Sequence, residues 1–394
     1  MTGSNAVVVG IGQTEYRRRG GWAAESELGL AARAIVAAVA DAGASLHDLD
    51  GLCSYANDMP GEDAYGAALL QVALGLPALR HSSFVWCAGG GGACAALGHA
   101  VAAVQSGHAN LVAVVRAVRQ SPDARYGQFN SRRPFFNWLT PAGAFAPAPL
   151  FALWMRRHMH EFGTTEQHLA EVALSARRNA NRNPNAIFHD QPLTAEDYHR
   201  ARMIAEPFRL FDCCLESDGA AAVLVTTRER ARDMRCRAVE VVAVGQGSGG
   251  GWGAGPLGSH NMPRESYTTG NLRAFADELF GRAGLSRDDV DVAQIYDAFT
   301  GMVLVTLEDF GFCGRGEGGP FVASGNIGYP QGLLPVNTSG GHLSEAYVHG
   351  MNLLVEGVRQ MRGTSTAQVE NARVCLVASA AGLSPSSAAL LGRS

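Results

Sequence analysis

The chain has 394 residues, of which 47% are hydrophobic and 17% charged, and its formal net charge is −4. A chain of this length can bury a large core, and its mild acidity excludes the basic surface of a nucleic-acid-binding protein. The sequence contains no run of 18 or more apolar residues, so we expect no membrane span. The eight cysteines have neither Cys-x-x-Cys nor zinc spacing. This predicts reduced thiols in a cytoplasmic protein without a metal site.

Lysine is missing from the sequence: all 32 residues counted as Lys or Arg are Arg. An aldolase that works through a Schiff base needs the amine of a lysine. Carbon–carbon chemistry in this protein would therefore need a different device.

Strand-like and helical segments alternate from the beginning of the chain, which predicts an α/β layered fold. The chain opens with a strand over 7–13, so we expect folded structure there rather than a signal peptide. The other elements expected in the first half are a helix over 27–42, a strand over 50–55, a helix that Gly89–Gly92 open and that runs to 105, and a strand over 110–115.

The segment 119–205 resembles neither half of the chain, being rich in Arg, Pro and aromatic residues, with one clear helix over 165–182. We interpret it as an inserted loop domain that covers the site, and a structural cap without substrate contact is the alternative. Beyond it, Ser217–Val225 predicts a turn and a buried strand of small residues, which marks the fold rather than the chemistry.

The order of elements returns in the second half. A Gly- and Ser-rich segment over 246–266 predicts a mobile loop there. The repeated elements are a strand over 239–245, a helix over 271–282, a strand over 292–297, a helix that Gly340 and Gly341 open and that runs to 361, and a strand over 374–378.

The joints between these elements match in sequence as well. Segment 42–50 (AGASLHDLD) aligns with 283–291 (AGLSRDDVD), and the same register places Tyr55 opposite Tyr296. We therefore predict two copies of one α/β unit with a site between them. The predicted limits are 1–118 with 206–235 for the N-terminal half, 119–205 for the loop domain and 236–394 for the C-terminal half.

Two tyrosines stand where sites of α/β proteins form, at a strand end and at a helix start. Tyr296 is followed by Asp297, and Tyr347 is followed two residues later by His349. A lone tyrosine usually serves packing, but the equivalent positions make catalysis an equal alternative to packing for Tyr296, Asp297, Tyr347 and His349, which are the candidate catalytic residues. His342 is open between a site residue and a rim residue.

Three motifs carry a family resemblance. SDGAAA at 217–222 resembles the thiolase-superfamily signature, YDAF at 296–299 resembles its Asn-Glu-Ala-Phe motif, and 340–350 (GGHLSEAYVHG) resembles its Gly-Gly…Gly-His-Pro-x-Gly block. The resemblance covers essentially the whole chain and is closest to the lipid-transfer-protein branch, within it to the steroid side-chain aldolases of bacterial sterol degradation. It implies a duplicated thiolase fold, with two α/β halves in a layered α-β-α-β-α sandwich and an inserted loop domain.

The departures from thiolase concern its catalytic residues. Motif alignment puts Gly89 at the position of the nucleophilic cysteine, while a shift of two residues would put Cys87 there. The second cysteine, expected near Gly382, is absent, the motif asparagine is Tyr296, and the catalytic histidine is Tyr347. Acyl transfer through an enzyme thioester is therefore not expected.

The resemblance implies retro-aldol cleavage of a β-hydroxyacyl-CoA, from a 17-hydroxy steroid side-chain thioester to a 17-ketosteroid and propionyl-CoA. Tyr347 is the favoured base and Tyr296 the acid or oxyanion donor, with the reverse assignment open. No cofactor is expected, since the substrate carries coenzyme A, and backbone positions expected to contact it are Gly89, Gly90, Gly341 and Gly382.

The family further implies a homodimer and a complex with a partner that carries an OB-fold and a zinc ribbon. Two other functions stay open from the sequence. One is a thiolase or acyl-CoA acyltransferase that uses Cys87, and the other is a non-catalytic subunit that binds acyl-CoA.

Overall fold

The computed structural model describes residues 5–57, 65–87, 90–120, 140–144, 146–249, 267–379, 381–382 and 385–394. Within these residues no helix is long and apolar enough to cross a membrane. Most of the expected mobile loop at 246–266 and part of the loop domain, 121–139, lie outside the described residues.

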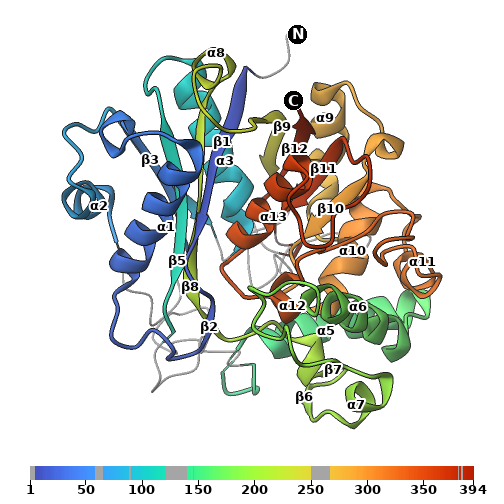
Figure 1. Cartoon of the computed structure of the whole chain (residues 1–394). Coiled ribbons are helices and arrows are strands. Elements are labelled where there is room, and N and C mark those ends of the chain that lie inside the picture. Colours follow the sequence, from blue (N-terminus) through green and yellow to red (C-terminus); the bar gives the residue numbers. More distant parts are fainter. Residues whose placement is uncertain are drawn as a thin grey trace.

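A ten-stranded mixed sheet forms the centre of the molecule (Figure 1). Its two parts meet where β1 and β9 pair antiparallel over two residues, Val7 with Glu240 and Val8 with Val239. The strand order is β10 (Val292–Ile295), β11 (Val374–Ala378), β12 (Ser386–Arg393), β9 (Val239–Gly247), β1 (Ala6–Gln13), β8 (Ser217–Thr227), β5 (Val112–Val118), β3 (Gly51–Asn57) and β4 (His81–Cys87), with β2 (Arg17–Arg18) paired to β8.

Helices occupy three layers around the two parts of the sheet (Figure 1). The middle layer contacts strands of both parts, and most residues of its two helices are buried, including polar and charged side chains of α13. The outer helices each cover one part. The middle layer is α3 (Ala93–Gln105) and α13 (Met351–Arg362), the N-terminal outer layer is α1 (Glu27–Ala42) and α2 (Ala67–Leu74), and the C-terminal outer layer is α9 (Arg273–Ala283) with α10 (Thr300–Phe310) beside it.

This arrangement confirms the predicted α/β class and the duplicated, layered architecture. The repeat is visible in detail at two aspartates. Asp50 accepts hydrogen bonds from two backbone N–H groups at the start of β5, at 2.8 and 3.0 Å. Asp291 does the same at the start of β11, at 2.7 and 2.9 Å. A carboxylate in the same register therefore fixes equivalent strand pairs in both halves, while the exact limits of the halves stay a prediction.

The inserted segment contributes helices that lie below the C-terminal half in Figure 1. The expected helix over 165–182 is confirmed as α6 (Glu166–Ala180), which begins after Thr165, whose side chain accepts from the backbone N–H of His168. The other elements here are α5 (Pro147–Phe162), α7 (Ala195–Arg200) and β6 (Met203–Ala205), which pairs with β7 (Phe208–Arg209) just beyond the segment.

One expected helix is wrong. The segment from Gly340 to 361 is not continuous: α12 (Gly341–Ser344) ends after one turn, and α13 begins only at Met351. The chain between them adopts positive φ at His349 (49°) and Gly350 (89°), which a helix cannot accommodate. The break presents residues 345–350 as a turn toward the centre of the molecule. Two further short helices are α8 (Arg228–Ala231) and α11 (Gly318–Ala323).

Candidate active site

The structure brings the two predicted tyrosines into direct contact. Tyr296 follows the end of β10, and Tyr347 lies in the turn between α12 and α13. Their hydroxyl oxygens are 2.7 Å apart, and the residues are only 1% and 7% exposed. Two phenols in hydrogen-bonding contact, held away from bulk water, can pass a proton to each other or to a bound substrate.

The ring of Tyr296 occupies space that a glycine leaves open. A Cβ atom on Gly90 would lie 1.9 Å from a carbon of that ring, a distance that no folded protein tolerates. The backbone N–H of Tyr296 donates to the carbonyl of Ala378 on β11, at 2.9 Å. Gly90 is therefore needed for the tyrosine that replaces the smaller asparagine of the family motif.

Tyr347 is held through its backbone. The hydroxyl of Ser217, at the start of β8, accepts from the N–H of Tyr347 at 2.7 Å and donates to its carbonyl at 3.2 Å. Ser217 is fully buried, so both hydrogen bonds form without competition from water. The SDGAAA motif, expected only to mark the fold, thus positions a site residue.

His342 belongs to the site rather than to its rim, since its side chain is fully buried and its ring is 4.5 Å from that of Tyr296 and 5.1 Å from that of Tyr347. Its Nε2 accepts from the N–H of Gly350 at 3.1 Å. Burial lowers the pKa of His342 to about 3, so the ring is neutral at pH 7.

Asp297 faces the start of α12 rather than the hydroxyl pair. Its carboxylate accepts from the backbone N–H of His342 at 2.7 Å, and one oxygen lies 3.3 Å from the Nδ1 of the same residue. Burial raises the pKa of Asp297 to about 7 despite these donors. A Cβ on Gly341 would meet this carboxylate at 2.2 Å, so Gly341 is required by the contact with Asp297.

His349 is a buried neutral histidine whose ring is 4.7 Å from that of Tyr347 and nearly perpendicular to it. Its Nδ1 lies 3.1 and 2.9 Å from Nε and one terminal nitrogen of Arg116 on β5. Burial, with Arg116 and His342 adding to it, lowers the pKa of His349 well below its usual value. Neither site histidine is a cation at neutral pH.

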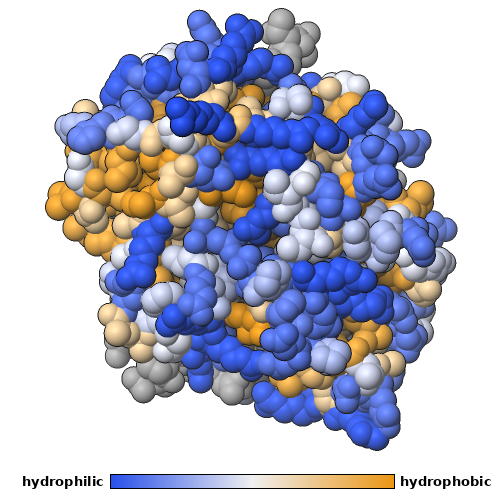
Figure 2. All heavy atoms as spheres, viewed as in Figure 1, coloured by the Kyte–Doolittle hydropathy of each residue, from blue (hydrophilic) through white to orange (hydrophobic). Residues whose placement is uncertain are grey.

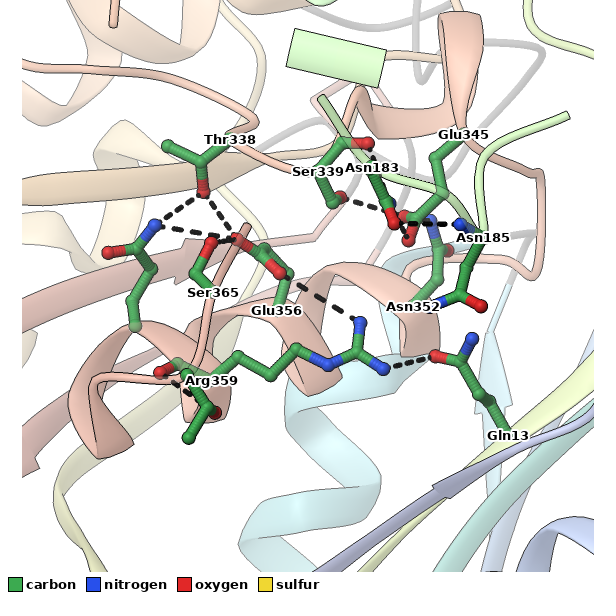
Figure 3. A network of polar contacts seen from close by, with 12 residues as sticks. Gln13, Asn183, Asn185, Thr338, Ser339, Glu345, Asn352, Glu356, Arg359 and Ser365 are labelled. Carbon is green, nitrogen blue, oxygen red and sulfur yellow. Dashed lines mark hydrogen bonds and ion pairs between the residues drawn. The ribbon is translucent and has the colours of Figure 1, made fainter. Parts of the chain in front are cut away.

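A buried polar network surrounds Glu345, which lies in the same turn as Tyr347 (Figure 3). The carboxylate of Glu345 accepts from Asn183 of the loop domain (3.1 Å), from Ser339 (2.8 Å) and from Asn352 of α13 (3.0 Å). Burial raises the pKa of Glu345 to about 7. The network thus ties the loop domain to the C-terminal half two residues before Tyr347.

The same view extends toward the N-terminal half. Thr338 and Ser365 donate to the carboxylate of Glu356 on α13, each at 2.6 Å. One turn further along this helix, Arg359 donates to Gln13 of β1 at 2.6 Å (Figure 3). All three regions of the chain are therefore joined by polar contacts along α13.

The remaining candidates from the sequence are two glycines expected to contact coenzyme A and two cysteines. Gly89 and the side chain of Cys87 lie outside the described residues. The backbone N–H of Gly382 donates to the carbonyl of Gly270 at 2.9 Å, so it is engaged within the protein. Cys94 is a buried packing residue on α3, and burial raises the pKa of its thiol to about 12.

Sequence reasoning missed Arg116 and Glu345 and left His342 open. A signal for Arg116 was present: it is the one charged residue in the strand VAVVRAV, every residue of which is buried. Among the described residues no group of three or more His, Cys, Asp or Glu could hold a metal ion.

Comparison with known proteins places these observations in a family. Residues 258–393 match the family model described as thiolase C-terminal domain-like. The chain is 39% identical over its whole length to the 17-hydroxy-3-oxo-4-pregnene-20-carboxyl-CoA lyase of Mycobacterium tuberculosis, all of which is covered. It is also 39% identical to the steroid side-chain-cleaving aldolase of Thermomonospora curvata, over 98% of this chain and 97% of that one.

Solved structures of thiolase-superfamily proteins resemble this chain as well. The structure called Ltp2-ChsH2(DUF35) aldolase superposes with a TM-score of 0.90 at 37% identity, over 99% of this chain and 98% of that one. Human mitochondrial 3-ketoacyl-CoA thiolase superposes with a TM-score of 0.69 over 99% of this chain and 98% of that one, but at 12% identity that likeness concerns the fold alone.

Proposed function

The chain belongs to the steroid side-chain-cleaving aldolases of the thiolase superfamily, and from this premise we propose that it cleaves a β-hydroxyacyl-CoA by a retro-aldol reaction. The substrate is a steroid with a 17-hydroxy acyl-CoA side chain, and the products are a 17-ketosteroid and propionyl-CoA. The observation that carries the proposal is the buried contact of 2.7 Å between the hydroxyls of Tyr296 and Tyr347.

The reaction needs one proton removed and one proton delivered. Tyr347 as phenolate takes the proton of the substrate hydroxyl, whose oxygen then forms the ketone as the Cα–Cβ bond breaks. The electron pair of that bond passes into the thioester and forms an enolate. Tyr296 delivers its proton to the enolate carbon. The proton that Tyr347 took from the substrate then passes across the 2.7 Å contact to Tyr296, which restores both tyrosines to their starting states. Atoms and charges balance without any further reactant.

The other site residues position this pair. His342 and His349 are neutral and pack against the two phenol rings, while Asp297 holds the first turn of α12 on which His342 stands. We assign the enolate oxygen to the backbone N–H of Gly90, which lies beside the Tyr296 ring just before α3 begins; the expected contact at Gly89 falls outside the described residues. Gly341 and Gly382 receive no part in this assignment, because contacts within the protein account for both.

The substrate supplies coenzyme A, so the proposed reaction uses no resident cofactor. We propose a homodimer formed through β4, the last strand in the sheet order. Phe84 and Trp86 on this edge strand are 51% and 76% exposed, and Figure 2 shows further apolar side chains over the neighbouring α2. An exposed apolar edge strand is a surface that natural proteins cover.

We also propose a complex with a partner that carries an OB-fold and a zinc ribbon. Support comes from the name of the structural relative, which contains a second component, ChsH2(DUF35), beside Ltp2. The backbone of this chain superposes on that relative with a TM-score of 0.90 over 99% of its length.

The experiment that tests the proposed function is co-expression with the partner, followed by mass spectrometry of the products from a 17-hydroxy steroid acyl-CoA. We expect equal amounts of 17-ketosteroid and propionyl-CoA, and insensitivity to a cysteine-directed alkylating reagent. Binding of the thioester without cleavage would instead indicate an acyl-CoA-binding subunit. Loss of turnover in Cys87→Ala, together with inactivation by the reagent, would indicate a thiolase or acyltransferase.

A further inference from the structure

A buried arginine stands behind the catalytic turn, in a strand that is otherwise apolar. Arg116 is 3% exposed at the centre of β5, whose other residues are all buried. A guanidinium is costly to bury and stays protonated in proteins. Packing alone does not account for a buried charge at this position, whereas the hydrogen bonds of the guanidinium do.

Arg116 and Tyr55 of the N-terminal half hold His349 of the C-terminal half from two sides. The guanidinium donates to His349 Nδ1 at 2.9 and 3.1 Å and to the carbonyl of Tyr55 at 3.1 Å. The hydroxyl of Tyr55 donates to the carbonyl of His349 at 2.8 Å. These hydrogen bonds join the two halves at His349, the residue whose positive φ of 49° shapes the turn.

These contacts decide the protonation of the His349 ring. Because the guanidinium of Arg116 only donates, His349 Nδ1 accepts and carries no proton. The proton of the neutral ring is then on Nε2. One imidazole ring separates the fixed positive charge of Arg116 from the phenol of Tyr347.

We propose that Arg116 is the positioning residue of the tyrosine pair: it holds His349 in the tautomer with the proton on Nε2, and its buried positive charge favours the phenolate form of Tyr347. This inference rests on the function proposed above, in which Tyr347 is the base. A free tyrosine loses its proton only near pH 10, so a phenolate at neutral pH needs a nearby positive charge.

Of the groups described around Tyr347, Arg116 supplies the positive charge. Tyr347 is faced by Tyr296, by His342 from α12 and by His349 from its own turn, and both histidines are neutral. The acidic groups, which act against a phenolate, are Asp297 behind His342 and Glu345 two residues before Tyr347. Burial raises the pKa of both carboxyls to about 7, so protons on them limit that opposition below neutral pH.

Neutral variants at position 116 test the charge. Arg116→Gln keeps a polar head, and Arg116→Met fills similar volume without one, so either suffices if the other does not fold. Arg116→Lys keeps the charge. The matched control is Arg362→Gln, because Arg362 is also buried and joins the halves through Asp41 and the carbonyl of Val9, away from the tyrosines.

Two measurements distinguish a positioning role of Arg116 from a purely structural one. The first is the pH titration of phenolate absorbance, taken as the difference between each protein and the same protein carrying Tyr347→Phe, which needs no substrate. The second is the pH profile of kcat/KM. In the neutral variants we expect the phenolate midpoint and the acid limb of the profile to rise by about one pH unit. This shift lowers kcat/KM about tenfold at neutral pH, and the activity recovers at higher pH.

Arg116→Lys is expected to move both readouts less than the neutral variants, and Arg362→Gln to lower thermal stability without moving either. A phenolate midpoint that stays in place in the neutral variants would overturn the proposal, whatever their activity. A midpoint that moves in a protein that cleaves no steroid thioester would overturn the proposed function and leave the role of Arg116 standing.

The tautomer has its own measurement. Nitrogen-15 spectra of histidine-labelled protein, with the His349 ring assigned by its loss in His349→Asn, are expected to show a neutral ring with the proton on Nε2. A proton on Nδ1 would overturn this half of the proposal.

Discussion

The side chain of Tyr296 fills the place where a Cβ of Gly90 would stand, at 1.9 Å from the ring. The glycine-rich start of α3 and the large aromatic residue after β10 therefore depend on each other. Replacing the family's asparagine by tyrosine is possible only because no side chain projects from residue 90.

Gly90→Ala is expected to displace the Tyr296 ring and lower kcat at least about a hundredfold, since misplacing a catalytic group by about 1 Å has effects of that size. Gly281→Ala is the control, because a Cβ there meets nothing within 4 Å and Gly281 lies within α9. The control is expected to keep full activity and gain slightly in stability. Equal activity of the two variants would mean that the ring position does not matter.

Ser217→Ala removes both hydrogen bonds that hold the backbone of Tyr347. We expect a loss of about 1–3 kcal/mol in the free energy of unfolding, because a buried N–H and a buried carbonyl lose their partner. A fall in kcat should accompany it, measured at a temperature where the variant is fully folded. Ser106→Ala, at the exposed end of α3, serves as the comparison and should change neither quantity noticeably. A variant with lower stability and unchanged kcat would show that Ser217 is purely structural.

The buried carboxyl of Glu345 should make stability depend on pH. Burial raises its pKa from 4.5 to about 7, so its contribution is present below about pH 4.5 and is lost as pH rises through 7. The lowered pKa values of His342 and His349 act in the opposite direction, so the informative quantity is a difference between proteins.

Relative to the wild type, Glu345→Gln is therefore expected to gain about 1–3 kcal/mol between about pH 5 and about pH 8. Urea unfolding at several pH values measures this. The same substitution at Glu278, whose side chain is 62% exposed, should show no such trend. A Glu345→Gln difference that is flat with pH would contradict the raised pKa.

The exposed edge at β4 predicts an interface between two copies of the chain. Trp86→Glu puts a charge on an edge strand where the side chain is 76% exposed, and we expect it to convert dimer to monomer. Light scattering after size-exclusion chromatography gives the mass directly. Leu333→Glu, also at a strongly exposed apolar residue (75%), is expected to leave the mass unchanged. A monomeric wild type, or a dimeric Trp86→Glu variant, would refute an interface at β4.

Much of the fold was accessible from sequence because its signals are local. The joint at 42–50 repeats at 283–291, and the aspartate at the end of each joint accepts from the start of the parallel strand that pairs with the strand after it. The tyrosine pair came from motif positions in the same way. Local patterns carry such information because each lies within one element and the loop that follows it.

What the sequence did not reveal depends on contacts between distant residues. Tyr55 and His349 are 294 positions apart, and Arg116 and His349 are 233 apart. The break between α12 and α13 has one sequence signal, the isolated Gly350, and the positive φ of His349 beside it appears only in the folded structure. Asp297, expected to act chemically, also accepts from the backbone N–H of His342 in α12, 45 positions away, a contact that depends on how the chain folds back after Asn337.

The central claim is that Tyr296 and Tyr347 carry the proton transfers of the retro-aldol step. The most direct measurement is kcat of Tyr296→Phe and Tyr347→Phe, in complex with the partner, on a 17-hydroxy steroid acyl-CoA. Each substitution removes one hydroxyl of the 2.7 Å contact and leaves the ring in place. We predict that each variant loses about 10²- to 10⁴-fold in kcat while keeping the wild-type fold. Full activity in both variants would contradict the account.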